Sequence, residues 1–122
     1  MPQSYPQEEY LSRICTYACC SFESYVCAST YIRRLERSCK HLIAPENAYA
    51  AVLTCVMVAA KFLDDVHFSN KEFAGIGSLE GHQMNTLEIQ LLFAIDFDLV
   101  VYISEFQYRY SQLWLPSSLF HG

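Results

Sequence analysis

The sequence predicts an all-α fold, an orthogonal bundle of five main helices and one short helix. Apolar residues recur at helical spacing along most of the chain. Residues 48–60 contain no charged side chain and are apolar around most of a helix, which predicts a central third helix surrounded by the others. The apolar segment 95–101 is interpreted as a turn rather than a strand. The short connections between these elements are compatible with a single packed bundle.

The first two helices are predicted at residues 8–18 and from Ser21 onward. Ser21 is suited to the N-cap position because its hydroxyl can accept a bond from a free backbone N–H group. Arg34 and Arg37 are expected at the more hydrated end of the second helix. Residues expected to face the core from these two helices are Leu11, Ile14, Cys15, Ala18, Phe22, Tyr25, Val26, Ile32 and Leu35.

The remaining helices are predicted from their start and stop signals. Pro45 fits the first turn of the third helix, which is expected to run to about Asp64. A short helix is expected at 70–74, followed by a Gly-Ile-Gly turn, and Ser78 is expected to cap a helix over 79–94. That helix has a core stripe of Met84, Leu87, Leu91 and Ile95 and a neighbouring stripe of Glu88 and Leu92. Ser104 is expected to cap a last helix over 105–113, which Pro116 stops.

Composition excludes several classes of protein. The 122 residues suffice for one domain, and 52% of them are hydrophobic, which argues against disorder. The formal net charge of −5 and the lack of a broad basic face argue against nucleic-acid binding. The chain has no apolar run of about 20 residues that could span a membrane, and its start does not resemble a secretory signal. We therefore expect an intracellular protein, in the nucleus, the cytoplasm or both.

The residues that could bind a metal or act in catalysis are scattered along the sequence. The six cysteines lack paired Cys-x-x-Cys spacing and lie mostly in apolar helical patterns, so we expect reduced thiols and no zinc. Asp64, Asp65, His67 and Glu72 match no metal loop and are interpreted as a solvated acidic turn. No nucleophile–base pair or phosphate loop is recognisable, so we expect no catalytic residues, no cofactor and no small-molecule substrate.

Residues 59–65, Ala-Ala-Lys-Phe-Leu-Asp-Asp, break two local rules. Lys61 interrupts an apolar run, so it must extend to solvent from the helix end or meet a partner. Asp64 and Asp65 would lie at the negative pole of the helix, which disfavours them. We assign the two aspartates no role beyond ending the helix.

Seven motifs, in order and spacing, resemble the cyclin box. They are Tyr10-Leu-Ser-Arg-Ile14, Ser21-Phe-Glu-Ser24, Tyr31-Ile-Arg-Arg-Leu35, Ala59-Ala-Lys-Phe-Leu-Asp-Asp65, Phe68-Ser-Asn70, Met84-Asn-Thr-Leu-Glu88 and Phe97-Asp-Leu99. The resemblance is to the single-box P-type and U-type cyclins, related to the fungal cyclin of the phosphate-response kinase. It implies one cyclin box over the chain, with its core at about 8–113 and a short tail at 114–122.

The resemblance also implies a function. Cyclins have no catalytic residues of their own; they bind and activate a cyclin-dependent serine/threonine protein kinase, in cell-cycle or nutrient-response control. The family's kinase-anchoring lysine and glutamate match Lys61 and Glu88. Its apolar kinase-binding patch matches Leu92, Phe97 and Leu99, with Phe62 at the margin. The alternative is a cyclin-fold adaptor that binds proteins in transcription without activating a kinase.

The chain departs from the family at Arg33, where Tyr-Ile-Asp-Arg-Leu is usual. In many cyclins that aspartate pairs with an arginine of the first helix, whereas Arg33 would repel Arg13 if the two were close. We expect this tether to be absent, or rebuilt through Glu36 or Glu9.

Overall fold

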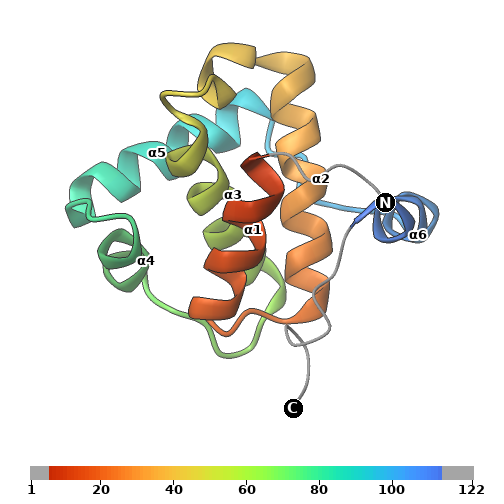
Figure 1. Ribbon diagram of the computed structural model, residues 1–122, viewed down its shortest axis with the longest axis horizontal. Coiled ribbons are helices and arrows are strands. Elements are labelled where there is room, and N and C mark those ends of the chain that lie inside the picture. Colours follow the sequence, from red (N-terminus) through yellow and green to blue (C-terminus); the bar gives the residue numbers. More distant parts are fainter. Residues whose placement is uncertain (1–5, 114–122) are drawn as a thin grey trace.

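The computed structural model describes residues 6–113, and every regular element in this range is a helix (Figure 1). In chain order these are α1 (Pro6–Tyr17), α2 (Phe22–Ser38), a 3₁₀ turn η1 (Lys40–Ile43), α3 (Ala48–Leu63), α4 (Asn70–Ile76), α5 (Gly81–Ala94) and α6 (Ile103–Gln112). This confirms the predicted all-α class, with no strand among these residues. Among the same residues, no helix is both long and apolar enough to cross a bilayer.

The third helix is central, as predicted. Every residue from 51 to 60 is buried, because α3 packs against α1, α2 and α5 and also contacts α4. Its neighbours contribute large side chains, among them Tyr25, Tyr31, Phe73 and Met84, all of which are fully buried. Gly77 approaches this core so closely that a Cβ atom there would lie 2.5 Å from Leu53 Cδ2, so a larger residue would force the buried Leu53 side chain to shift.

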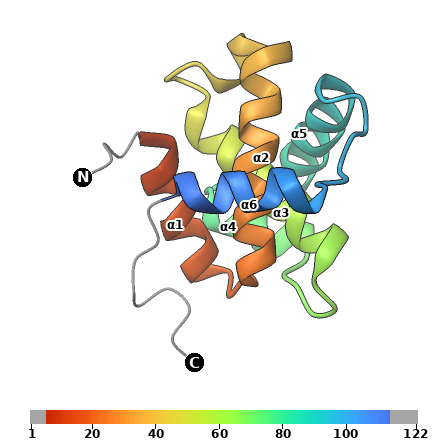
Figure 2. The same cartoon turned by 90° about the vertical axis from the view of Figure 1, so that its right-hand side faces the viewer.

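The last helix lies at the margin of this core, where Phe106 packs against it. Figure 2 shows α6 crossing α2 on the outside of the bundle, and α6 itself has no buried residue. Phe22 was expected to face the core, but it is half-buried and packs edge-on against Phe106 and Tyr110 of α6 instead. The remaining residues predicted to face inward from the first two helices are buried.

Two predicted helix starts are confirmed. Ser21 is the N-cap of α2, and its hydroxyl accepts a bond of 3.1 Å from the N–H group of Ser24. Ser69 caps α4, where its hydroxyl and the Glu72 carboxylate each accept a bond from the other's N–H group. Hydrogen bonding from Ser69, first of all from its backbone N–H group, lowers the pKa of the Glu72 carboxyl below its ordinary value.

Other predicted boundaries are wrong. Pro45 lies in a turn before α3, because η1 occupies the preceding residues and the Asn47 N–H group bonds the Ala44 carbonyl. Ser78 does not cap α5. It has a φ of 56° and ends α4, where the Leu79 N–H group bonds the Ala74 carbonyl in a Schellman arrangement.

The ends of three other helices also differ from prediction. Helix α4 continues through Gly75 to Ile76, with Gly77 as its C-cap, where a glycine turn was expected. Helix α6 begins at Ile103, so Ser104 lies within the helix instead of capping it. Helix α1 ends at Tyr17, one residue early, because Cys19 adopts a φ of 54° and closes a Schellman turn. Pro116 and the predicted tail lie outside the described residues.

Candidate partner-binding surface

Lys61 and Glu88 meet, although 27 residues separate them in the chain. Lys61 lies in the last turn of α3 and Glu88 in the middle of α5. The Lys61 ammonium lies 2.7 Å from Glu88 Oε2, with 33% of the lysine side chain and 19% of the glutamate side chain exposed. The lysine that interrupts the apolar run therefore has a specific acidic partner at the surface and does not simply extend into solvent.

Asn70 holds both members of this ion pair. Its Oδ1 accepts a bond of 2.9 Å from Lys61, and its Nδ2 donates to Glu88 Oε1 at 3.0 Å and to Asn85 Oδ1 at 2.8 Å. Asn70 is the first residue of α4, so three helices converge on one polar cluster. The sequence contained Asn70 within the motif Phe68-Ser-Asn70, but reasoning from the sequence did not single it out as a site residue.

The cluster retains unused hydrogen-bonding capacity. A lysine ammonium has three donors and a carboxylate can accept about four bonds. The bonds above use two donors of Lys61 and one acceptor position on each oxygen of Glu88. A donor and an acceptor are therefore held side by side, which suits a partner's backbone C=O and N–H groups.

The predicted apolar site residues divide into two classes. Phe62, next to Lys61, and Phe97, after α5, are exposed, whereas Leu92 and Leu99 are half-buried and pack against the core. The end of α5 and the segment that leads to α6 lie on one side of the molecule, at the right of Figure 2. The charged cluster is thus followed along α5 by apolar side chains that contact solvent.

Sequence reasoning missed two members of this surface. Phe93 is 69% exposed and packs edge-on against Phe97 with ring centroids 5.1 Å apart, and Ile89, one turn earlier, is also exposed. Both lie outside the core stripe of α5, and apolar residues outside a core stripe are the available signal for an interface. We call Lys61, Phe62, Glu88, Ile89, Leu92, Phe93, Phe97 and Leu99 the candidate partner-binding surface.

Asp64 has a structural role that the sequence did not reveal. Its carboxylate accepts bonds from the Ser21 N–H group at 3.2 Å, from the Ser21 hydroxyl and from the Ser24 hydroxyl at 3.0 Å. The aspartate at the negative pole of α3 therefore lies at the positive pole of α2, which favours a negative charge. This contact fixes the end of α3, three residues after Lys61.

The tether at Arg33 is rebuilt, which is the second of the two outcomes expected from the sequence. Arg33 lies 3.8 Å from Glu8 of α1 and also pairs with Glu36, one turn along α2. Glu36 was one of the two expected acids, whereas Glu8 was not foreseen. Compared with the family pattern, the acid is now on the first helix and the arginine on the second.

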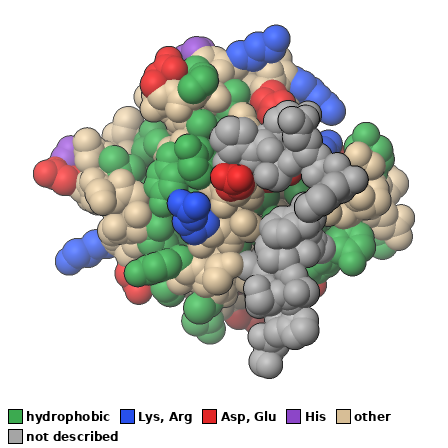
Figure 3. Space-filling model, viewed as in Figure 1, with side chains coloured by type: hydrophobic (Ala, Val, Ile, Leu, Met, Phe, Trp, Pro, Cys, Tyr) green, Lys and Arg blue, Asp and Glu red, His purple; other side chains and the backbone are tan. Residues whose placement is uncertain are grey.

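Other faces of the molecule differ from this surface. Figure 3 views the side on which α1 lies, where apolar side chains gather around an open hollow lined by Arg13, Ile14, Tyr17, Tyr49, Gly75 and Ile76.

Within residues 6–113, no three His, Cys, Asp or Glu side chains are grouped so that they could hold a metal ion. Burial raises the pKa of the Cys27 thiol to about 11, so this thiol stays protonated at neutral pH.

The chain belongs to the cyclin family, because the cyclin family model matches residues 6–99. The fold is accordingly a cyclin box.

Plant cyclins of two types are similar to the chain. It is 40% identical to Cyclin-U3-1 of Arabidopsis thaliana over 92 residues, which are 75% of this chain and 42% of that protein. Over 102 residues it is 39% identical to Cyclin-U1-1 of the same plant, covering 81% of this chain and 48% of that protein. Cyclin-P1-1 of Oryza sativa subsp. japonica is 36% identical over 94 residues, 76% of this chain and 36% of that protein. The chain thus spans less than half the length of these three relatives.

Proposed function

We propose that this protein is a regulatory subunit that binds a cyclin-dependent protein kinase as a heterodimer and activates it. The observation that supports this most directly is the Lys61–Glu88 pair, held by Asn70 beside exposed apolar side chains. A polar anchor at the rim of an apolar patch is the usual anatomy of a protein interface. Membership of the cyclin family supports the choice of partner.

In this proposal Lys61 and Glu88 bind the kinase backbone just before its regulatory helix. The remaining donor of Lys61 reaches a carbonyl, and the remaining acceptor positions of Glu88 reach an N–H group. Phe62, Phe93 and Phe97 cover the apolar side of the regulatory helix and hold it in the position that phosphoryl transfer requires. The protein itself contributes no catalytic group, so it acts by changing the population of the active kinase conformation.

The ion pair is expected to give orientation more than stability. Exposed pairs contribute about 0–1 kcal/mol to folding because water screens them and the side chains lose freedom. A kinase that covers the pair removes this water and strengthens each bond, and a variant lacking one partner would leave the other charge buried alone. Kinase binding should therefore respond to these residues much more than folding does.

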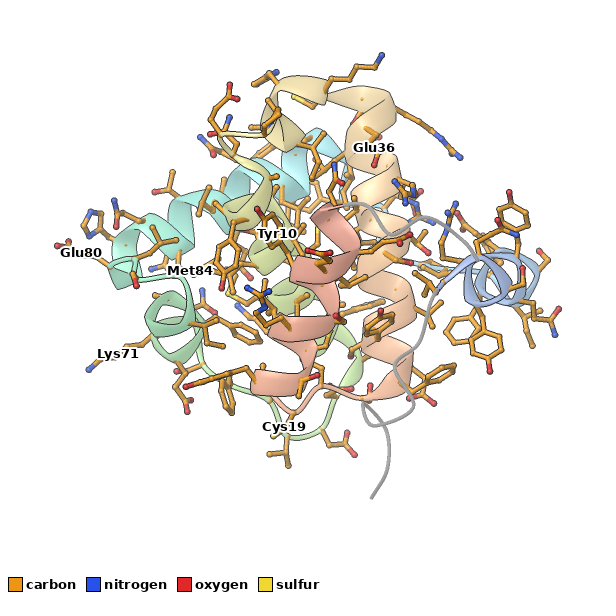
Figure 4. The ribbon with its side chains drawn as sticks, viewed as in Figure 1. Tyr10, Cys19, Glu36, Lys71, Glu80 and Met84 are labelled. Atoms are coloured by element: carbon orange, nitrogen blue, oxygen red, sulfur yellow. The ribbon has the colours of Figure 1, made fainter. Side chains whose placement is uncertain are left out.

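The test is a double variant, Lys61→Ala with Glu88→Ala, assayed by co-purification with a cyclin-dependent kinase and by kinase activity. We expect loss of binding with an unchanged helical circular dichroism spectrum. The matched control is Lys71→Ala with Glu46→Ala, because both side chains are exposed and Lys71 points away from the molecule (Figure 4). Unchanged binding in the Lys61/Glu88 variant would refute this site.

The same assay separates activation from adaptor function. Stimulation of phosphoryl transfer by the wild-type protein supports the kinase-activating role, whereas kinase binding without stimulation favours the adaptor. We place the complex in the nucleus, the cytoplasm or both, which fluorescence microscopy of the tagged protein tests.

A further inference from the structure

Two side chains of α2 bind three successive backbone carbonyls of the segment that carries Leu99. The Arg34 guanidinium donates to the carbonyl of Asp98 and, at 2.9 Å, to that of Val100. Between them, the Tyr31 hydroxyl donates to the Leu99 carbonyl at 2.7 Å. Tyr31 and Arg34 are three residues apart, so they lie on the same face of α2.

These bonds replace those that secondary structure would supply. Residues 98–101 belong to neither a helix nor a strand, so their carbonyls have no ladder or helical partner. The segment follows Asp96 and Phe97, which have φ angles of 58° and 55° and close a Schellman turn at the end of α5. Side chains with Cβ atoms adopt this left-handed conformation only at a cost, so the chain needs other contacts to hold it there.

Arg34 is placed for this task and not for contact with solvent. It was expected at the hydrated end of α2, yet only 14% of its side chain is exposed. Its guanidinium also lies 2.9 Å from Glu105 of α6 and 3.6 Å from the Asp98 carboxylate. The planar fork of arginine can serve several acceptors at once, which a lysine ammonium at the same position cannot reproduce.

Tyr31 also contributes to holding this segment. Its ring is fully buried, and burial raises the pKa of its phenol, so the hydroxyl stays protonated and acts as a donor. Arg34 lies over the same ring, 5.9 Å from its centroid. The two side chains form one unit, which we call the α2 clamp.

We propose that the α2 clamp is a positioning device that holds Phe97 and Leu99 in the geometry that the kinase requires. Arg34 and Tyr31 themselves are directed to the backbone behind the surface, so their contribution to kinase affinity acts through the 97–100 segment. This inference rests on the proposed function and adds to it residues that contact no kinase.

The first test uses the isolated protein and hydrogen–deuterium exchange. Arg34→Lys keeps the charge and Tyr31→Phe keeps the ring, so both are expected to fold. Each should raise amide exchange across residues 97–101 while leaving α3 protected. Arg37→Lys, one turn further along α2 at an exposed position, is the matched control. Unchanged exchange at 97–101 in both variants would overturn the inference without any kinase being involved.

The second test is a double-mutant cycle in kinase affinity. Arg34→Lys should weaken kinase binding about tenfold, since it loses charge-assisted bonds to two carbonyls. Leu99→Ala should also weaken binding but keep its own carbonyl. If the clamp acts through this segment, Leu99→Ala will cost much less in the Arg34→Lys background than alone. Full additivity would contradict a positioning role.

The outcomes separate the two proposals. If Lys61, Glu88 and Leu99 variants all bind the kinase normally, the proposed function fails. If those variants lose binding but Arg34→Lys and Tyr31→Phe retain wild-type affinity, only the clamp proposal fails.

Discussion

The two halves of the chain differ in how many of their apolar residues are buried. Helices α2 and α3 bury ten and eleven residues, whereas α5 buries two and α6 none in the described structure. Several large apolar residues of the second half, among them Ile89, Phe93, Phe97 and Ile103, are exposed. Most apolar residues of the first half lie in the shared core, whereas many of those in the second half contact solvent.

This difference separates stability from recognition. Removing a side chain from α3 should affect folding, while removing one from the end of α5 should affect a partner. The polar cluster of Lys61, Asn70 and Glu88 lies at the boundary, because α3 contributes the lysine and α5 the glutamate. The following variants test this division, beginning with the largest expected effect.

Leu53→Ala should reduce the free energy of unfolding by about 3 kcal/mol. Leu53 is fully buried in the middle of α3, and truncating a buried leucine leaves a cavity that the surroundings fill only in part. Urea denaturation measures the change. Ile89→Ala, at an exposed aliphatic position on α5, should stay within about 0.5 kcal/mol of wild type. Equal losses in both variants would contradict the division.

Asp64→Ala should cost about 2 kcal/mol, because three donors at the start of α2 lose a charged acceptor. Thermal denaturation is the measurement. The neighbouring carboxylate supplies the control: Asp65 is exposed, so Asp65→Ala should change the melting temperature little. A comparable loss in both variants would mean that the carboxylate of Asp64 has no special role.

Phe93→Ser should leave stability within about 0.5 kcal/mol of wild type but weaken kinase binding about tenfold, which corresponds to roughly 1.4 kcal/mol. The ring is mostly exposed and contacts Phe97, so its loss opens no core cavity. Calorimetric titration with the kinase measures the affinity. The control is Tyr108→Ser on α6, which removes another exposed ring and should leave kinase affinity unchanged. If Tyr108→Ser binds the kinase more weakly than Phe93→Ser does, the kinase-binding surface lies on α6 and not on α5.

The Glu8–Arg33 pair should contribute the least, about 0.5 kcal/mol in a double-mutant cycle of alanine variants. The side chains are 15% and 27% exposed and 3.8 Å apart, so water screens them in part. Urea denaturation at low salt and at 1 M salt measures the coupling, which should fall as the screening length shortens. A coupling that does not depend on salt would contradict an electrostatic tether.

Local patterns predicted much of the fold. Apolar spacing together with start and stop signals identified the six α-helices of residues 6–113, and the uncharged run at 48–60 identified the central one. The N-cap at Ser21 followed from side-chain chemistry that acts within one turn. Such features depend on residues a few positions apart, so a sequence records them directly.

Helix ends were less predictable because the usual glycine signal is missing. Cys19, Ser78 and Asp96 all adopt the left-handed conformation at the end of a helix, where glycine is the common residue. Each is stabilised by Schellman bonds rather than by its own preference. Serine is a common N-cap residue, which is why Ser78 was expected to begin a helix, but in the structure it ends α4.

The candidate site was predicted in part, and through family resemblance more than through periodicity. Lys61 and Glu88 were expected as a pair and do lie in contact, while their role in kinase binding stays a prediction. Asn70, Phe93 and the α2 clamp were not foreseen. Asparagine is common at the start of a helix and arginine is common near its end, so neither Asn70 nor Arg34 stands out in the sequence as a site residue.

The local sequence is sufficient to place the helices, to identify the central one and to show that Lys61 and Asp64 are unusual where they stand. The partners of charged side chains follow from the folded arrangement instead: Lys61 contacts Glu88 across 27 residues, Asp64 contacts Ser21 across 43, and Arg34 contacts Val100 across 66. Periodicity and capping arise from neighbours within a turn or two. Contacts between distant residues depend on how the helices cross, which is set by the packing of the whole core.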